Sequence, residues 1–134
     1  MTTDERRRMN ARNTLAVLAL TIGSALLLVS VAAAKDGDVR VRGTCTGSVT
    51  SKLKLSQEDG GIEIEFELDQ NRNGVPWRVI LRRGGSVVAS TTVRTRPPSG
   101  SFEVRRVISG SAGTRVTATA TNLSAGTCRA AARF

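Results

Sequence analysis

The sequence contains no histidine and no tyrosine, and its aromatic side chains are three phenylalanines and one tryptophan. Histidine is the commonest general base and metal ligand, so its absence argues against most acid–base enzymes and excludes the Ser-His-Asp arrangement. The absence of tyrosine rules out the tyrosine corner of antibody-type domains. We expect the core to take all four aromatics, which leaves none for stacking on bases and predicts no specific nucleic-acid recognition.

The first 34 residues differ in composition from the rest of the chain. Four arginines in residues 1–13 precede residues 14–34, which carry no charge and end in three alanines. A basic start, an apolar run and a small-residue end are typical of a secretory signal peptide. The run also approaches the ~20 residues that span a bilayer, so an uncleaved signal-anchor helix remains the alternative. Both alternatives export residues 35–134, either secreted or held at the membrane only through residues 14–34.

Only two cysteines, Cys45 and Cys128, are present. An even number of cysteines in a small exported domain predicts a disulfide. On the chain-entropy model, closing so long a loop stabilises the fold by about 4 kcal/mol. Paired in this way, the cysteines are neither nucleophiles nor metal ligands.

The exported part contains eight segments with period-two alternation and none with helical periodicity. They are residues 38–45, 49–56, 62–69, 76–83, 87–96, 101–108, 114–121 and 127–133. Turn residues separate them, and Gly84-Gly85 is typical of a two-residue hairpin turn. The pattern predicts an all-β fold: a single antiparallel β-sandwich of immunoglobulin-like architecture over residues 35–134, preceded by a signal or anchor helix over residues 1–34. The pair Arg105-Arg106 breaks the alternation, which predicts a β-bulge there.

The stretch DQNRNG, residues 69–74, interrupts the alternation. Asp69, Asn71 and Asn73 stand at alternate positions before a glycine, which matches the first half of a calcium-binding loop. The twelfth loop position is Ile80, which has no oxygen to complete the calcium shell. Asparagine and glycine also tolerate the positive φ of a tight hairpin. We therefore favour a tight hairpin or short loop, keep calcium as the alternative, and expect no other cofactor.

Three glutamates, Glu63, Glu65 and Glu67, alternate with apolar residues before this stretch. A hairpin would place Arg78 and Arg82 opposite them, as ion pairs on a solvated face. Acid–base hydrolysis also uses paired carboxylates, but one of them needs a raised pKa in apolar surroundings. We therefore expect a non-catalytic domain and keep an enzyme that uses the glutamate row as an alternative.

The chain carries 20 basic and 11 acidic residues, a net charge of +9. Outward rows of basic side chains are expected at Arg40, Arg42, Lys52, Lys54, Arg94, Arg96, Arg129 and Arg133. A basic exported domain attracts anionic polymers, although the charge also serves solubility. The expected function is binding or structural, at the cell envelope or outside the cell. The expected partner is an anionic cell-wall polymer or another envelope protein, and its binding should weaken with salt.

The stretches DQNRNG (69–74) and PSGSFEVRR (98–106), with the two cysteines, resemble a family of small secreted proteins of high-GC Gram-positive, actinobacterial-type bacteria. The resemblance covers nearly all of residues 38–132. It implies export and a compact β domain. It implies no activity, substrate or site, because none is assigned to that family.

Overall fold

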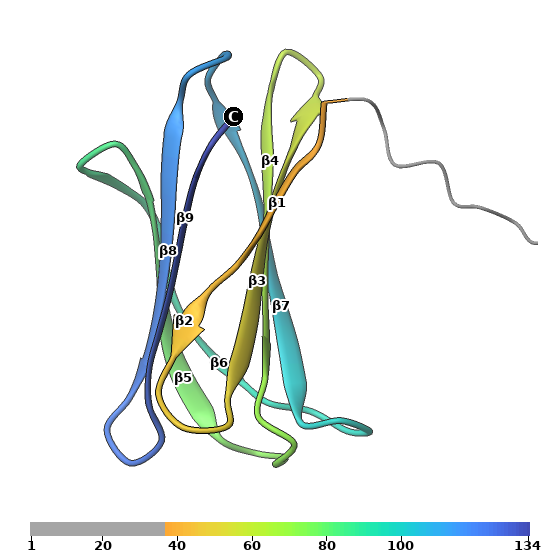
Figure 1. Ribbon diagram of the computed structural model, residues 1–134, viewed down its shortest axis with the longest axis vertical. Coiled ribbons are helices and arrows are strands. Elements are labelled where there is room, and N and C mark those ends of the chain that lie inside the picture. Colours follow the sequence, from red (N-terminus) through yellow and green to blue (C-terminus); the bar gives the residue numbers. More distant parts are fainter. Residues whose placement is uncertain (1–36) are drawn as a thin grey trace, which may run out of the picture. The chain divides into compact units, whose positions relative to one another are not determined.

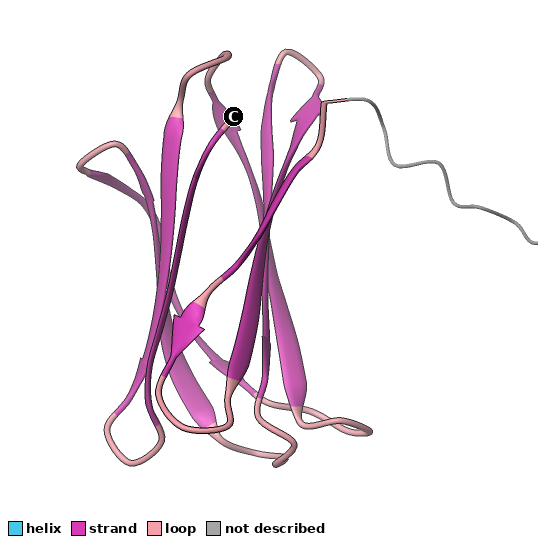
Figure 2. Cartoon of the chain, viewed as in Figure 1, coloured by secondary structure: helices cyan, strands magenta, loops and turns pink. Residues whose placement is uncertain are grey.

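The computed structural model describes residues 37–134, which form nine strands and no helix (Figures 1 and 2). The strands are β1 (Val39–Arg42), β2 (Thr44–Cys45), β3 (Thr50–Glu58), β4 (Gly61–Asp69), β5 (Pro76–Arg83), β6 (Ser86–Arg94), β7 (Ser101–Ser109), β8 (Arg115–Asn122) and β9 (Gly126–Arg133). Within these residues no helix has the length and hydropathy needed to cross a membrane. The predicted leader over residues 1–34 lies outside the described residues.

The strands form two antiparallel sheets that face each other (Figure 1). The first sheet has the order β1-β3-β4-β7 and the second β2-β9-β8-β5-β6. Side chains from both sheets build one apolar core. The prediction of an all-β antiparallel domain is therefore confirmed, and the packing of its two sheets is that of a β-sandwich.

The core consists of side chains that the alternation assigns to the inner faces. Phe66 on β4 and Trp77 on β5 are its largest members, and both are fully buried. Burying one such side chain contributes roughly 1.5–3 kcal/mol. Their charged neighbours along the chain point outward, as Glu67 beside Phe66 does with 45% of its side chain exposed. The inward positions predicted for Phe66 and Trp77 are thus confirmed, whereas Val87, which alternation also assigns to the core, is 55% exposed.

The first predicted strand is divided between the two sheets at Gly43. Before it, β1 pairs with β3, and after it β2 pairs with β9. A Cβ at Gly43 would lie 2.1 Å from the side-chain oxygen of Ser51 and 3.0 Å from the carbonyl oxygen of Arg129. Only glycine therefore lets the chain cross at this point, where its N–H donates to the carbonyl of Ser51 at 2.9 Å.

Cys45 and Cys128 form a disulfide, as predicted. They lie directly opposite each other in the β2–β9 ladder. The bond joins residues 83 positions apart and ties the first strands to the last. It therefore holds together the two parts of the domain where fraying would begin.

Residues 70–75 form a short loop, as one of the two predicted alternatives had it, but they do not form a hairpin, so the hairpin prediction is wrong. The segment carries the chain from β4 in the first sheet to β5 in the second. Both edges of β4 are already occupied, by β3 after the two-residue turn Asp59-Gly60 and by β7. Arg78 and Arg82 consequently lie on the second sheet and do not oppose the glutamates. Alternation predicts which side chains of a strand point into the core, but it does not predict which strands pair with that strand, and this explains the error.

The predicted bulge at Arg105-Arg106 is also wrong. The β4–β7 ladder is continuous, with Glu65 opposite Arg105 and Ile64 opposite Arg106. Arg106 occupies a core-side position but remains exposed, because β7 is an edge strand. The register shift of the domain lies elsewhere, between Leu81 and Arg82 in the β5–β6 hairpin. That hairpin turns at Gly84-Gly85, as predicted.

Candidate functional site

The acidic row of β4 lies on the outer face of the first sheet, between basic side chains of β3 and β7. Glu65 lies 3.1 Å from Lys54 Nζ and 2.7 Å from a terminal nitrogen of Arg105. Glu67 lies 3.7 Å from Lys52 Nζ. The row therefore finds its counter-charges within its own sheet, where such cross-strand pairs stabilise by roughly 0.2–1 kcal/mol each.

Glu63 and Glu65 are less solvated than the sequence predicts, since each side chain is only 15% exposed. Burial raises the pKa of Glu63, the neighbouring Glu65 raises it further, and the charge of Arg105 opposes them. Burial also acts to raise the pKa of Glu65, but Lys54 and Arg105 outweigh it and hold that pKa below its ordinary value. The pKa values of Glu63 and Glu65 are therefore shifted in opposite directions.

Two carboxylates with separated pKa values are what acid–base hydrolysis uses, so the position of Glu63 matters. A groove of about 350 Å³ runs over the outer face of the first sheet. Glu65 and Glu67 line it together with basic side chains of β1 and β3, but Glu63 does not. The carboxylate with the raised pKa thus lies outside the groove in which a substrate would sit.

The eight predicted polyanion contacts do not form one surface. Arg40, Arg42, Lys52 and Lys54 lie on the outer face of the first sheet, among the acids. The second sheet carries Arg94, Arg129 and Arg133, and Arg96 follows β6 in the connection to β7. The first sheet therefore carries a face of mixed charge, and the second sheet carries a separate basic face.

The outer face of the second sheet carries no acidic residue. Every Asp and Glu of residues 37–134 lies on the first sheet or in a segment next to it, and after Asp69 only Glu103 remains. The basic residues of the second sheet's strands are all arginines: Arg78, Arg82, Arg83, Arg94, Arg115, Arg129 and Arg133. Arg78, Arg82, Arg83 and Arg115 were not among the predicted contacts. The absence of acids from residues 70–134, Glu103 apart, is the sequence signal that points to this face.

The arginines of this face flank a column of threonines on β8. Across the ladders the pairs are Arg78–Thr121, Arg82–Thr117 and Arg129–Thr119. Arginines of β5 and β9 are therefore about 10 Å apart across the sheet, and Arg78 and Arg82 are about 13 Å apart along their strand. We call the outer surface of β5, β8 and β9 the Arg–Thr face.

The arginines of the Arg–Thr face have no acidic partners. All the ion pairs within residues 37–134 involve side chains on or beside the first sheet. Arg115 and Arg133 even lie directly opposite each other, and like charges so placed are destabilising. Arg133 donates to the carbonyl of Gly113 at 3.1 Å, which holds the side chain without neutralising it. The face is therefore an uncompensated positive surface.

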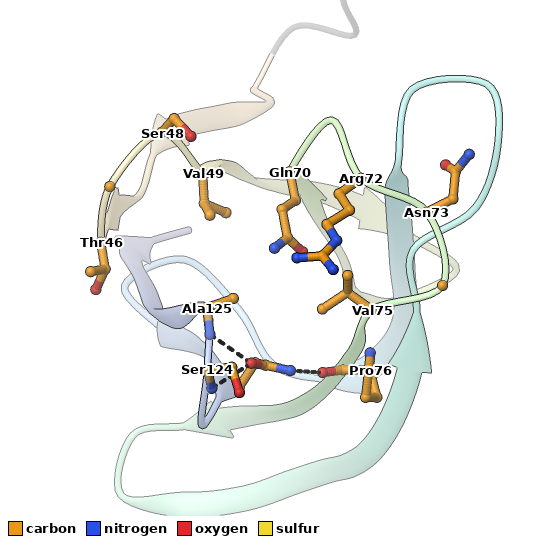
Figure 3. A pocket seen from close by; sticks show the side chains of 13 residues that line it. Thr46, Ser48, Val49, Gln70, Arg72, Asn73, Val75, Pro76, Ser124 and Ala125 are labelled. Atoms are coloured by element: carbon orange, nitrogen blue, oxygen red, sulfur yellow. Dashed lines mark hydrogen bonds between the residues drawn. The ribbon is translucent and has the colours of Figure 1, made fainter.

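A pocket of about 650 Å³ lies at one end of the sandwich (Figure 3). Three connections form it: residues 46–49 between β2 and β3, residues 70–75 between β4 and β5, and residues 122–125 between β8 and β9. Figure 3 shows Arg72 and Gln70 directed toward the centre of the pocket, and Asn73 directed away from it. The interrupted stretch therefore forms one wall of a pocket.

The wall formed by residues 70–75 is held by Thr95, whose side chain is buried. Its hydroxyl donates to the carbonyl of Arg72 at 2.6 Å and accepts the N–H of Val75 at 2.9 Å. Gly100 packs against the same segment so closely that a Cβ there would lie 2.2 Å from the backbone nitrogen of Arg72. The sequence did not point to Thr95 or Gly100 for this role, because both lie 20 or more residues from the segment they hold.

The opposite wall is held by Asn122. Its side-chain oxygen accepts the N–H groups of Ser124 and Ala125 at 2.8 and 2.7 Å, and its amide donates to the carbonyl of Pro76 at 2.6 Å (Figure 3). Hydrogen bonds from one side chain thus shape the 122–125 turn and fix it to β5. Both walls are ordered before any ligand arrives, which lowers the entropic cost of binding.

The candidate calcium ligands serve first as loop-forming groups. Asp69 Oδ1 accepts the N–H of Asn71 at 2.9 Å, and Asn71 has a φ of 55°. Gly74 has a φ of 77°, as expected for a glycine in a tight turn. Within residues 37–134, no three or more His, Cys, Asp and Glu side chains gather as metal ligands do. Calcium binding at this segment stays a prediction.

Comparisons with family models, with curated proteins and with solved structures gave no match to the chain. The resemblance to actinobacterial secreted proteins therefore stays a prediction. The function must be argued from the surfaces of the domain.

Proposed function

We propose that the chain is an exported, non-catalytic β-sandwich of immunoglobulin-like architecture that binds anionic polymers through its Arg–Thr face. The observation that carries the proposal is the separation of charge between the two sheets. The first sheet pairs Lys52, Lys54 and Arg105 with acids, whereas the strands of the second sheet carry arginines and no acid. Solubility alone would not require the acids to be confined to one sheet.

The geometry of the Arg–Thr face suits an extended ligand. Apart from the facing pair Arg115 and Arg133, its arginines lie about 10–13 Å apart over three strands, so one small anion cannot engage most of them. A polymer with repeated phosphate or sulfate groups can, and each arginine then offers a planar pair of N–H donors. Thr119 and Thr121 add hydroxyl groups between the arginine columns.

The location outside the cytoplasm is part of the same proposal. The disulfide suits an oxidising compartment, and the leader has the pattern of an export signal. An anionic polymer of the cell wall would be within reach of a protein exported in this way. The proposal includes no enzyme activity. Glu63, the carboxylate with the raised pKa, lies outside the groove on the outer face of the first sheet, so it is not placed to act on a substrate there.

Salt-dependent retention on a heparin or phosphate-polymer column tests this function. The informative variant is R78Q/R129Q, and the matched control is R42Q/R96Q. All four side chains are exposed, and none makes an ion pair or hydrogen bond within residues 37–134. We expect R78Q/R129Q to elute at clearly lower salt than R42Q/R96Q, because contacts to anionic groups are salt-sensitive. Equal elution of the two variants, or no retention of the parent protein at low salt, would refute the proposal.

A further inference from the structure

Gln70 offers hydrogen-bond donors to the pocket at the end of the sandwich. The buried indole N–H of Trp77 donates to Gln70 Oε1 at 3.0 Å. Because an indole nitrogen only donates, the oxygen end of the amide must face Trp77. The NH₂ end is then the part of Gln70 that remains for a ligand, and it can only donate.

Arg72 adds a guanidinium beside this amide. Its side chain points into the pocket (Figure 3) and belongs to none of the ion pairs within residues 37–134. Its backbone is held by Thr95 and Gly100, so the guanidinium projects from a fixed position. No acidic residue lines the pocket. Two neighbouring donor groups without a counter-charge form a site for an oxyanion.

The rest of the pocket suits a small apolar group next to that oxyanion. Figure 3 shows Val49, Val75 and Ala125 facing the centre, and hydroxyl-bearing residues Thr46, Ser48 and Ser124 line the rim. The volume of about 650 Å³ lies within the range of pockets that hold small ligands. Aliphatic side chains form the floor, so it lacks the aromatic surface on which bases and other planar rings stack.

The geometry points to a site for the C-terminal carboxylate of a peptide whose last side chain is small and apolar. Arg72 and the NH₂ group of Gln70 bind the carboxylate, and Val49, Val75 and Ala125 contact the side chain. The hydroxyl of Thr46 is occupied by the backbone of Thr127, which leaves Ser48 and Ser124 on the rim to bind the peptide backbone. This site is separate from the Arg–Thr face, and loss of polymer binding would leave it intact.

The single tryptophan makes the site directly observable. Trp77 is the only tryptophan of the chain, so its indole N–H gives one signal in a ¹H–¹⁵N spectrum. The probe is N-acetyl-Ala-Ala, titrated into the ¹⁵N-labelled full chain, and the control ligand is the same dipeptide with a C-terminal amide. We expect a saturable shift of the indole signal with the free carboxylate and at least a tenfold weaker response to the amide, which cannot accept the charge-assisted bonds.

Substitution of Arg72 tests which side chain holds the carboxylate. R72Q should weaken the dipeptide at least about tenfold, R72K should weaken it less, and R96Q, which removes the same charge outside the pocket, should leave it unchanged. An unshifted indole signal in ligand-free R72Q shows that the pocket itself is intact. If R72Q disturbs that signal, the dipeptide affinities of R72K and R96Q are compared instead. Weaker binding by R72K than by R96Q then supports the proposal, and equal binding contradicts it.

Three results would overturn the proposal. The first is a dipeptide titration that leaves the indole signal in place. The second is an equal response to the carboxylate and the amide. The third is a response to inorganic phosphate as strong as the response to the dipeptide, which would make the pocket a general anion site.

Discussion

The indole nitrogen of Trp77 lies 3.0 Å from the side-chain oxygen of Gln70, and this hydrogen bond joins the centre of the core to the rim of the end pocket. Trp77 is fully buried, so its N–H has no access to water. The bond therefore contributes to the stability of the sandwich and also fixes the orientation of a pocket side chain.

Replacement of Gln70 by alanine leaves the indole N–H without a partner. We expect Q70A to lower the free energy of unfolding by about 1–3 kcal/mol, the cost of an unsatisfied buried donor. Urea unfolding followed by Trp77 fluorescence measures it. The matched control is Q57A, because Gln57 is exposed although its amide also donates to a carbonyl, that of Gly61. A loss no larger for Q70A than for Q57A would contradict this role of the bond.

Replacement of Thr95 by valine keeps the shape of the side chain and removes its hydroxyl. The N–H of Val75 then loses its acceptor and the carbonyl of Arg72 its donor. We expect T95V to lose about 1–3 kcal/mol of stability and to exchange the Val75 amide hydrogen faster. The control is T92V on the outer face of β6. Unchanged exchange at Val75 in T95V would show that the 70–75 wall is held by other contacts.

Glu63 and Glu65 should respond to substitution in opposite directions. The pKa of Glu65 is held below its ordinary value, so its carboxylate stabilises the fold at neutral pH, and this contribution disappears as the pH falls through the folded-state pKa. The pKa of Glu63 is raised, so the folded state prefers it protonated, and its ionised form costs stability above that pKa.

Unfolding free energies at pH 7 and at pH 3–4 test this difference. At pH 7 we expect E65Q to be destabilised, and E63Q to be neutral or slightly stabilised. The destabilisation of E65Q should shrink as the pH drops below about 4, because the parent carboxylate is then protonated as well. Equal losses in both variants at pH 7 would contradict the pKa assignment.

Calcium should leave the melting temperature unchanged. Asp69 uses one carboxylate oxygen to hold the N–H of Asn71, and Arg72 adds a positive charge to the same loop. The test is a melting curve with millimolar calcium against one with a chelator, and magnesium controls for general ionic effects. A calcium-specific rise in melting temperature that D69N abolishes would establish the metal site instead.

Alternation along the chain predicted which side chains of each strand point into the core, but not which strands pair with each other. The inward positions of Trp77 and Phe66 follow from period two, and the disulfide between Cys45 and Cys128 follows from an even number of cysteines in an exported domain. The partners of β4 do not, because cross-strand neighbours depend on the path of the whole chain. The glutamates were therefore assigned the wrong arginines, although the requirement for basic partners was right.

The end pocket was less accessible to prediction than the core. Thr95 and Gly100 hold a loop from positions distant in the sequence, and no sequence pattern links either of them to residues 70–75. The Arg–Thr face was more accessible. Once two sheets are assumed, the near absence of acids after Asp69 predicts that strands from the second half of the chain carry uncompensated charge.

Mapping the polymer contacts on the protein tests the central claim most directly. A short phosphate polymer is titrated into the ¹⁵N-labelled full chain, and both the backbone amide and the arginine Nε–H signals are followed. Binding through the Arg–Thr face predicts shifts at Arg78, Arg82 and Arg129 that fade as salt is added, with little change around Lys52 on the first sheet. Shifts centred on the first sheet, or spread evenly over both sheets, would contradict it.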